Sequence, residues 1–222
     1  MANWRTHPTV LAGESKGNKK TSFVEIEGNL PGRMLFASDF SEANFYRYES
    51  KYGPDEAMTP HQVSVAAESF AAGLFAQSGY DVLVQYGANL PNYDLVVVGV
   101  EKMEAVSVKG SKDGGWALAI SKKKKGMGIT YHAAIDEWLR CQRPGVIFCF
   151  VQFLNVGVGE IPRSYLASAP EVAAHLKTQC FGRGHLALME DFRVVRPKGR
   201  YTDRIPSEWK FTHQRFATLT GA

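Results

Sequence analysis

The sequence predicts a mixed α/β domain in which helices flank a central mixed sheet. Three observations predict this fold class: a well-capped amphipathic segment over 60–78, three short apolar segments in succession over 81–109, and a further helical and apolar pair over 131–153. Helix and strand periodicities that alternate along one chain are typical of layered α/β architectures. The expected order of elements is a helix, three strands, a helix and a strand.

The first helix has the clearest local signals. Thr59 is a good N-cap, Pro60 suits the first helical position, and Gln62 completes a capping box. Gly79 follows the last turn and is expected to end the helix, which is predicted over 60–78. Its apolar face is expected at Val63, Ala66, Ala67, Phe70 and Leu74.

Three strands are expected next, over 81–86, 93–100 and 105–109. The second is almost entirely apolar, which indicates burial on both faces of the sheet. The short turn EKME separates the second and third strands, so an antiparallel hairpin can join them.

The second half of the chain is predicted to repeat the alternation. A glycine-rich loop leads to 116–121, which can be a short strand or a lid segment. A helix is expected over 131–140 and a strongly buried strand over 146–153. A further strand over 162–168 and a helix over 170–179, with Ser168 as its cap, complete the pattern.

The predicted organisation has three parts. Residues 1–57 form an N-terminal extension, with 15–22 mobile, 22–28 a candidate strand, and 39–52 an arm or short helix. Residues 58–190 form the core, and 191–222 form a basic C-terminal extension.

Composition excludes several classes of protein. The chain has 222 residues, 45% hydrophobic and 22% charged, as in an ordinary globular protein. The longest apolar run, around Val146 to Val151, is far below the roughly 18 residues of a membrane span. The N-terminal segment MANWRTHPTV has no apolar region of a signal peptide, and the three cysteines form no CxxC pair. We therefore expect a cytoplasmic protein without a membrane partner.

Polar residues at the ends of the apolar strands are the first candidates for chemistry. Asp94 begins the second strand, and Lys109 closes the third. Ser107 and Lys109 are two residues apart and point to the same face, which can also hold Asp94 if the two strands pair. Each residue taken alone can equally be an ordinary solvent-exposed strand end.

Glu68 is the third candidate because it lies at the edge of the helix's apolar arc. Its neighbours Ser64 and Ala71 are small and would let the carboxylate reach the sheet. The alternative is a solvated glutamate on the helix surface.

Together these features resemble the PD-(D/E)XK nuclease superfamily over residues 59 to about 190. The capped helix carries Glu68, the stretch NLPNYDLVVVG carries Asp94, and EAVSVKGS carries Lys109. In that superfamily a helical acid, a strand-leading Asp and an acid-x-Lys form one site. The resemblance implies a restriction-endonuclease-like αβββαβ core. The chain departs from the pattern at Ser107, where the superfamily has Glu, Asp or sometimes Gln.

The resemblance implies a metal-dependent endonuclease that hydrolyses phosphodiester bonds in DNA. Glu68, Asp94 and a backbone carbonyl near Val108 would hold Mg²⁺ or Mn²⁺, Lys109 would stabilise developing charge, and Ser107 would be a weak neutral ligand. Glu101 and Glu104 in the hairpin are alternative acids. The alternative function, favoured by Ser107, is a degenerate domain that binds nucleic acid or another protein.

The charge distribution also suits a polyanion. The net charge is +4, and the basic residues cluster in two stretches. The first cluster, the candidate nucleic-acid contact, is Lys122, Lys123, Lys124 and Lys125. The second is Arg193, Arg196, Lys198, Arg200 and Arg204. A solvated loop and tail are the alternative reading, and a homodimer is left open.

Overall fold

The computed structural model describes the chain in two compact units, residues 1–57 and 58–222. The second unit is described over 58–85, 93–99, 102–123, 128–196 and 199–221, with only the backbone described over 192–196 and 199–202. The first unit is described as backbone alone, over three strands: β1 Phe23–Glu25, β2 Met34–Ala37 and β3 Arg47–Tyr48.

The three strands of the first unit form an antiparallel sheet in the order β1-β2-β3. Strand β1 lies within the strand predicted over 22–28. Within 39–52, where an arm or a short helix was predicted, the described residues are those of β3, which form a strand and not a helix. The predicted mobile segment 15–22 lies outside the described residues.

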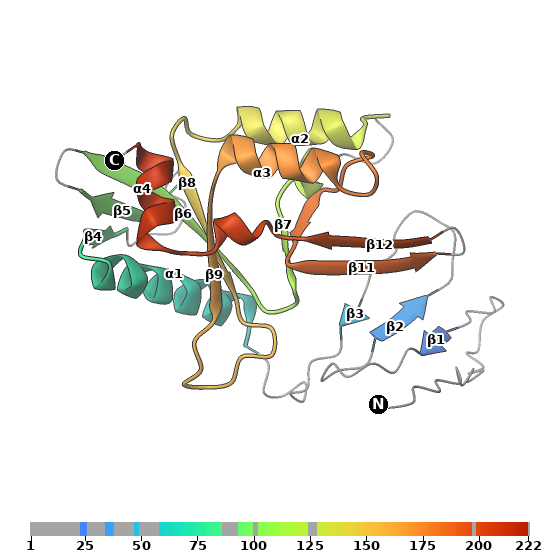
Figure 1. Cartoon of the computed structure of the whole chain (residues 1–222), viewed down its shortest axis with the longest axis horizontal. Helices are drawn as coiled ribbons and strands as arrows, with labels where there is room; N and C mark the ends of the chain where they lie inside the picture. The colour runs from blue at the N-terminus through green and yellow to red at the C-terminus, as the bar shows by residue number, and fades with distance from the viewer. Residues whose placement is uncertain are drawn as a thin grey trace, which may run out of the picture. The chain divides into compact units, whose positions relative to one another are not determined.

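A five-stranded mixed sheet forms the centre of the second unit (Figure 1). Its order is β4 Asp81–Val84, β5 Leu95–Val98, β6 Met103–Ser111, β8 Ile147–Gln152 and β9 Arg163–Ser168. The predicted hairpin is confirmed, because β5 and β6 pair antiparallel with Leu95 opposite Val106. Strands β6 and β8 are parallel, and α2 (Tyr131–Arg140) lies between them in sequence, as a parallel crossover requires. The predicted mixed α/β architecture, with helices flanking the sheet, is confirmed at this level.

Helix α1, Pro60–Gln77, begins at the predicted capping box. The Thr59 N–H donates to Gln62 Oε1 at 2.7 Å, and the Gln62 N–H donates to Thr59 Oγ1 at 3.3 Å. The buried line of the helix is rotated from the predicted apolar face, since Ala66, Phe70 and Leu74 are only half-buried. The buried residues are Val63, Ala67, Ala71 and Phe75.

The rotation follows from close contact between α1 and β6. A Cβ atom added at Gly110 would lie 2.8 Å from Val63 Cγ1, 2.8 Å from the Val63 carbonyl oxygen and 2.9 Å from Ala67 Cβ. The small Ala67 side chain and the bare Gly110 backbone therefore face each other where the helix crosses the strand.

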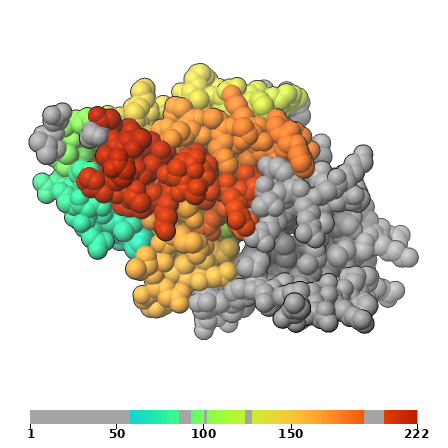
Figure 2. Space-filling model, in the orientation of Figure 1, coloured from blue at the N-terminus to red at the C-terminus, as the bar shows by residue number. Residues whose placement is uncertain are grey.

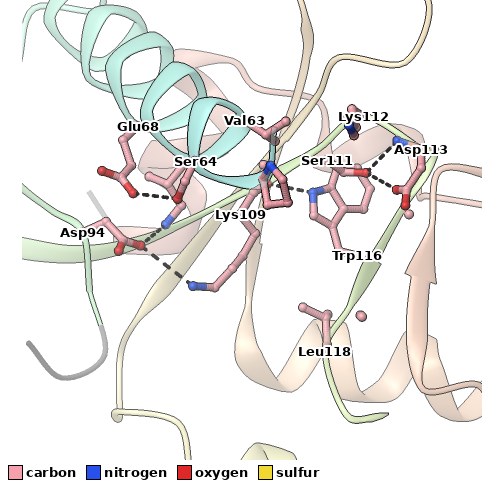
Figure 3. Close-up of a pocket in the computed structure, with 15 residues that line it drawn as sticks. Val63, Ser64, Glu68, Asp94, Lys109, Ser111, Lys112, Asp113, Trp116 and Leu118 are labelled. Atoms are coloured by element: carbon pink, nitrogen blue, oxygen red, sulfur yellow. Dashed lines mark hydrogen bonds and ion pairs between the residues drawn. The ribbon is translucent and has the colours of Figure 1, made fainter. Parts of the chain in front are cut away.

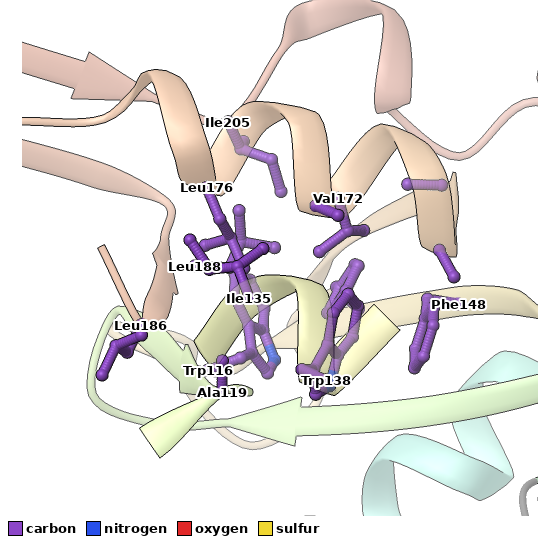
Figure 4. Close-up of a cluster of buried hydrophobic side chains, with 14 of the residues drawn as sticks. Trp116, Ala119, Ile135, Trp138, Phe148, Val172, Leu176, Leu186, Leu188 and Ile205 are labelled. Atoms are coloured by element: carbon purple, nitrogen blue, oxygen red, sulfur yellow. The ribbon is translucent and has the colours of Figure 1, made fainter. Parts of the chain in front are cut away.

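Apolar side chains form a core on each face of the sheet. Strand β8 is buried along its whole length, as its apolar run predicts, and its residues alternate between the two cores. Cys149 faces the core under α1, where burial raises the pKa of its thiol to about 12. Phe148 and Phe150 face α2 and α3 (Ala169–Thr178), together with Trp116 and Trp138 (Figure 4).

Residues 191–222, which were predicted to be a C-terminal extension, belong to the same compact unit as residues 58–190. Trp209 is buried in the core under α2 and α3, and Phe216 of α4 (His213–Thr220) is buried in the core under α1. Between them, the Phe211 N–H donates to the Ser164 carbonyl at 2.9 Å, so this segment covers the outer edge of β9. Figure 2 shows the red C-terminal residues spread over this face, beside the orange residues of α3.

Four more strands, paired as two two-stranded sheets, belong to the second unit. The segment left open as strand or lid contains β7 Gly115–Ala117, followed by a 3₁₀ turn at Ile120–Lys122. Strand β7 pairs with β10 Ala187–Met189. Strands β11 Asp191–Arg196 and β12 Gly199–Arg204 form an antiparallel hairpin.

Helix α3 is capped by a network that should make the stability of the fold depend on pH. Glu171 accepts hydrogen bonds from the Ser168 N–H and hydroxyl, both at 2.8 Å, and pairs with Arg215 Nη2 at 2.7 Å. Partial burial raises the pKa of the Glu171 carboxyl, but the Ser168 and Arg215 interactions outweigh it and hold the pKa below 4.5. A carboxylate whose pKa is lowered on folding stabilises the native state above its unfolded pKa, and this contribution is lost as pH falls.

We therefore expect Glu171→Gln to lower the free energy of unfolding at about pH 7 by on the order of 1 kcal/mol, because glutamine keeps an acceptor for the Ser168 N–H but loses the charge that pairs with Arg215. The wild type should then lose stability on acidification below about pH 4.5 more steeply than the variant does. Urea unfolding of the wild type and the variant, at about pH 7 and below about pH 4.5, measures the free energy of unfolding of each. Identical pH profiles for the two proteins would contradict the assignment.

Candidate functional site

A pocket of about 390 Å³ opens where the first turns of α1 cross β6 (Figure 3). Residues of α1, the residue before β5, the end of β6 and the loop to β7 line it. The polar or charged side chains in the lining that could bind a ligand or take part in a reaction include Ser64, Glu68, Asp94, Lys109, Lys112 and Asp113.

The carboxylate of Asp94 extends the ladder between β5 and β6. The Asp94 N–H donates to the Val106 carbonyl at 2.8 Å, one position before β5 begins. Beyond that point, Asp94 Oδ2 accepts the Val108 N–H at 2.6 Å and the Ser107 hydroxyl at 3.2 Å. These donors fix the orientation of the carboxylate, and no residue in the described part of the chain donates a hydrogen bond to Oδ1.

Lys109 lies on the face shared by Asp94 and Ser107, as the strand period predicts. Its Nζ atom is 4.0 Å from Asp94 Oδ2, and the two side chains are 41% and 29% exposed. The Lys109 carbonyl accepts the Trp116 indole N–H at 2.7 Å, and the Trp116 ring packs beside Phe150 in the core. A half-exposed ion pair contributes only about 0–1 kcal/mol to stability, so the ammonium is able to turn toward another anion.

Ser107 is buried at 5% exposure, and its hydroxyl points to Asp94. In this geometry the serine acts as a hydrogen-bond donor that orients the carboxylate. A glutamate or aspartate at the same position would instead present a second negative charge to Asp94.

Glu68 approaches the pocket from α1. The carboxylate is half-buried, and its Oε1 atom accepts the Ser64 hydroxyl at 3.2 Å. In Figure 3 the carboxylates of Glu68 and Asp94 and the ammonium of Lys109 lie around the same end of the pocket.

The donor set determines which metal ion the pocket suits. Across the described ranges no three His, Cys, Asp or Glu side chains gather closely enough to hold a metal ion by themselves. Glu68 and Asp94 line one end of the pocket and are the two candidate carboxylate ligands there, while Asp113 lines the other end. Such a set fits a hydrated Mg²⁺ or Mn²⁺ ion, which needs oxygen ligands and keeps several of its waters.

The hairpin acids considered as substitutes do not contribute a ligand within the described residues. Glu104 pairs with Lys102 Nζ at 3.0 Å and stands opposite Val97. It lies near the start of β6, whereas the pocket lies at the end of that strand. Glu101 lies outside the described residues.

Sequence reasoning missed several residues of the pocket. Asp113 accepts the Ser111 hydroxyl at 2.8 Å at the end of the pocket away from Glu68 (Figure 3). Lys112 donates to the Met58 carbonyl and so ties this loop to the start of α1. The i, i+4 spacing of Ser64 and Glu68 was a usable signal, whereas the position of Trp116 depends on the distant pairing of β7 with β10.

The structure describes only part of the two basic clusters. Lys122 Nζ lies 3.2 Å from Cys141 Sγ, and Lys123 Nζ lies 3.9 Å from the centre of the Tyr131 ring. Arg204 Nε lies 3.5 Å from Asp191 Oδ1. The remaining basic side chains lie outside the described residues: Lys124, Lys125, Arg193, Arg196, Lys198 and Arg200.

Comparisons with other proteins leave the chain without an assigned family: no protein-family model, no curated protein and no solved structure matches it. In the described part of the chain, no helix combines the length and the apolar character needed to cross a bilayer.

Proposed function

We propose that this protein is a metal-dependent endonuclease that hydrolyses phosphodiester bonds in DNA. The observation that carries the proposal is the pairing of an oriented carboxylate with an ammonium in an open pocket: Asp94 Oδ2 lies 4.0 Å from Lys109 Nζ, and Glu68 lines the same pocket.

The order of the elements supports the proposal. An antiparallel meander β4-β5-β6 follows α1, and α2 then leads to β8, which is parallel to β6. This order is compatible with the αβββαβ core that the resemblance implies. In such a core the site would lie at the start of the second strand and the end of the third, where this chain has Asp94 and Lys109.

Glu68 and Asp94 would hold Mg²⁺ or Mn²⁺, with the Val108 carbonyl as a further candidate ligand. When bound, the ion would polarise the phosphate and make a bound water more acidic. The other roles belong to the chain. Ser107 and the Val108 N–H hold the Asp94 carboxylate in place, and the Lys109 ammonium would stabilise negative charge that develops on the phosphoryl oxygens.

Basic residues outside the pocket would bind the rest of the substrate. Phosphate contacts from lysine and arginine position a nucleic acid without reading its sequence. The lysine run that begins at Lys122 follows β7, whose Ala117 lines the pocket, so it is the first candidate for such contacts.

A degenerate domain that binds nucleic acid or protein without cutting is the alternative. The orientation of Ser107 favours it, because the position that would carry the third acid instead donates a hydrogen bond to Asp94.

Cleavage of plasmid and oligonucleotide DNA, with Mg²⁺ or Mn²⁺ and in EDTA, tests the proposal, and Ser107→Glu separates it from the alternative. We expect the wild type to cut only with metal. We expect Ser107→Glu to bind metal more tightly and to keep or raise cleavage at low Mg²⁺, because it adds a charged oxygen ligand. Position 107 is buried beside Asp94, so the variant should also be less stable in EDTA and gain more than the wild type from added Mg²⁺.

Ser107→Ala is the matched control, since it removes the donor and adds no charge. A wild type that is inert beside a Ser107→Glu variant that cuts would establish the degenerate domain. If neither protein cuts and calorimetry detects no metal binding to either, the metal site at Glu68 and Asp94 is wrong.

A further inference from the structure

The turn that follows α3, Cys180–Gly184, holds an aromatic side chain outward in an unfavourable backbone conformation. Cys180, Phe181 and Gly182 are consecutive left-handed residues, with φ values of 54°, 60° and 79°. Phe181 is 77% exposed. A bulky residue rarely adopts this conformation, and such strain persists only where surrounding contacts enforce it.

Backbone hydrogen bonds close the turn onto the end of α3. The Gly182 N–H donates to the Thr178 carbonyl at 3.0 Å, and the Gly184 N–H donates to the Gln179 carbonyl at 3.0 Å. The Phe181 ring is therefore attached to a fixed turn rather than to a free loop.

The turn also packs against the first turn of α2. His132 Nε2 and the Gly182 carbonyl form a hydrogen bond at 2.8 Å. A Cβ atom at Gly184, where φ is 89°, would lie 3.1 Å from the His132 ring and 3.2 Å from Tyr131 Cβ. The glycine thus allows a close approach that brings the turn and Tyr131 onto one surface.

Two cations lie on that surface. Lys123 Nζ is 3.9 Å and Arg183 Cζ is 5.7 Å from the centre of the Tyr131 ring. We call Phe181, Arg183, Tyr131 and Lys123 the Phe181 surface. It combines an exposed ring with neighbouring cations, which is the combination that proteins use to bind single strands: bases stack on aromatic rings while basic groups contact the backbone phosphates.

We propose that the Phe181 surface binds unpaired nucleotides, with a base stacked on the Phe181 ring and phosphates contacted by Arg183 and Lys123. This proposal rests on the proposed function in one respect: it takes the bound strand to be the substrate of the nuclease site. A duplex presents no free base face to the ring. A protein partner would call for a contiguous apolar patch, whereas Phe181 shares its turn with two glycines and an arginine.

Binding of fluorescein-labelled oligothymidine of about 12 nucleotides, and of a duplex of the same length, in EDTA tests the proposal without cleavage. We expect Phe181→Leu to weaken oligothymidine binding about tenfold, the usual effect of losing one stacked base, and to leave duplex binding unchanged. Leucine keeps an apolar side chain in the same backbone conformation. The double variant Arg183→Ala/Lys123→Ala should weaken both ligands and reduce their salt dependence. Lys210→Ala, which removes an exposed charge outside the Phe181 surface, is the control.

Phe181→Trp provides a direct optical readout. Trp116, Trp138 and Trp209 are at most 5% exposed, and the fourth tryptophan, Trp4, lies outside the described residues. The emission of the wild type, titrated in parallel, is therefore the background against which the added indole at position 181 is measured. We expect this variant to bind oligothymidine as the wild type does, with its added emission quenched by the bound bases.

Three results would overturn the proposal: no oligothymidine binding by the wild type at low salt, equal binding by folded Phe181→Leu, or no quenching in Phe181→Trp. Failure of the proposed function has a different signature, because loss of cleavage with metal leaves the binding differences in EDTA intact.

Discussion

Asp94→Asn should abolish metal-dependent cleavage while leaving the fold intact. The asparagine keeps a side-chain oxygen that accepts from the Val108 N–H and the Ser107 hydroxyl, so the junction between β5 and β6 retains its acceptor. It loses the negative charge that the proposed metal ion and Lys109 require. We expect calorimetry to show weakened Mg²⁺ or Mn²⁺ binding, and urea unfolding to change by less than about 1 kcal/mol, the range of a half-exposed ion pair.

Lys109→Ala provides the comparison within the same site. It should lower the cleavage rate by on the order of 10² to 10³, as the loss of one preorganised charge-stabilising group does, while metal binding stays close to that of the wild type. Lys102→Ala removes an ammonium that pairs with Glu104 outside the pocket, and it should cut normally. Full activity of Asp94→Asn, or equal losses in all three variants, would contradict the assigned roles.

The parts of the fold that follow from local signals were predictable. The capping box at Thr59 and Gln62 defines the start of α1, and the uninterrupted apolar run defines β8. The orientation of α1 was predicted less well, because it depends on contact with Gly110 about forty residues away in the chain, and helical period alone does not include that contact.

The contribution of the C-terminal segment could not be predicted from periodicity. Trp209, Phe211 and Phe216 are irregularly spaced and sit among charged residues, so no helical or strand pattern identifies them as buried or packed against a core. Their burial arises from contact with β9, α1 and α3, which are distant in sequence.

The candidate site was partly predictable for a similar reason. The side-chain alternation of a strand and one short hairpin suffice to bring Asp94, Ser107 and Lys109 together. The hydrogen bond from Ser107 to Asp94 was not predictable, because it depends on β5 beginning one residue after Asp94. Trp116 reaches Lys109 only after β7 pairs with β10, some seventy residues later in the chain.

Gly110→Ala should damage both the fold and the site. The added methyl would meet the Val63 carbonyl at 2.8 Å and Ala67 Cβ at 2.9 Å, and a backbone carbonyl cannot rotate away as a flexible side chain can. Helix α1 must therefore shift from β6. Overpacking of this kind typically costs about 1–3 kcal/mol, and we expect a corresponding decrease in the free energy of unfolding.

The same shift should change the pocket, because Glu68 is carried by the helix that moves and Lys109 by the strand that it leaves. We expect the folded fraction of Gly110→Ala to bind Mg²⁺ more weakly than the wild type. Gly73→Ala is the matched control: it makes the same substitution in α1 at an exposed position with no atom within 4 Å of the added Cβ. It should stabilise the protein by up to about 1 kcal/mol through helix propensity and leave metal binding unchanged. Urea unfolding and calorimetry on both variants measure these effects, and wild-type stability in Gly110→Ala would show that α1 does not lie on β6 as closely as Gly110 requires.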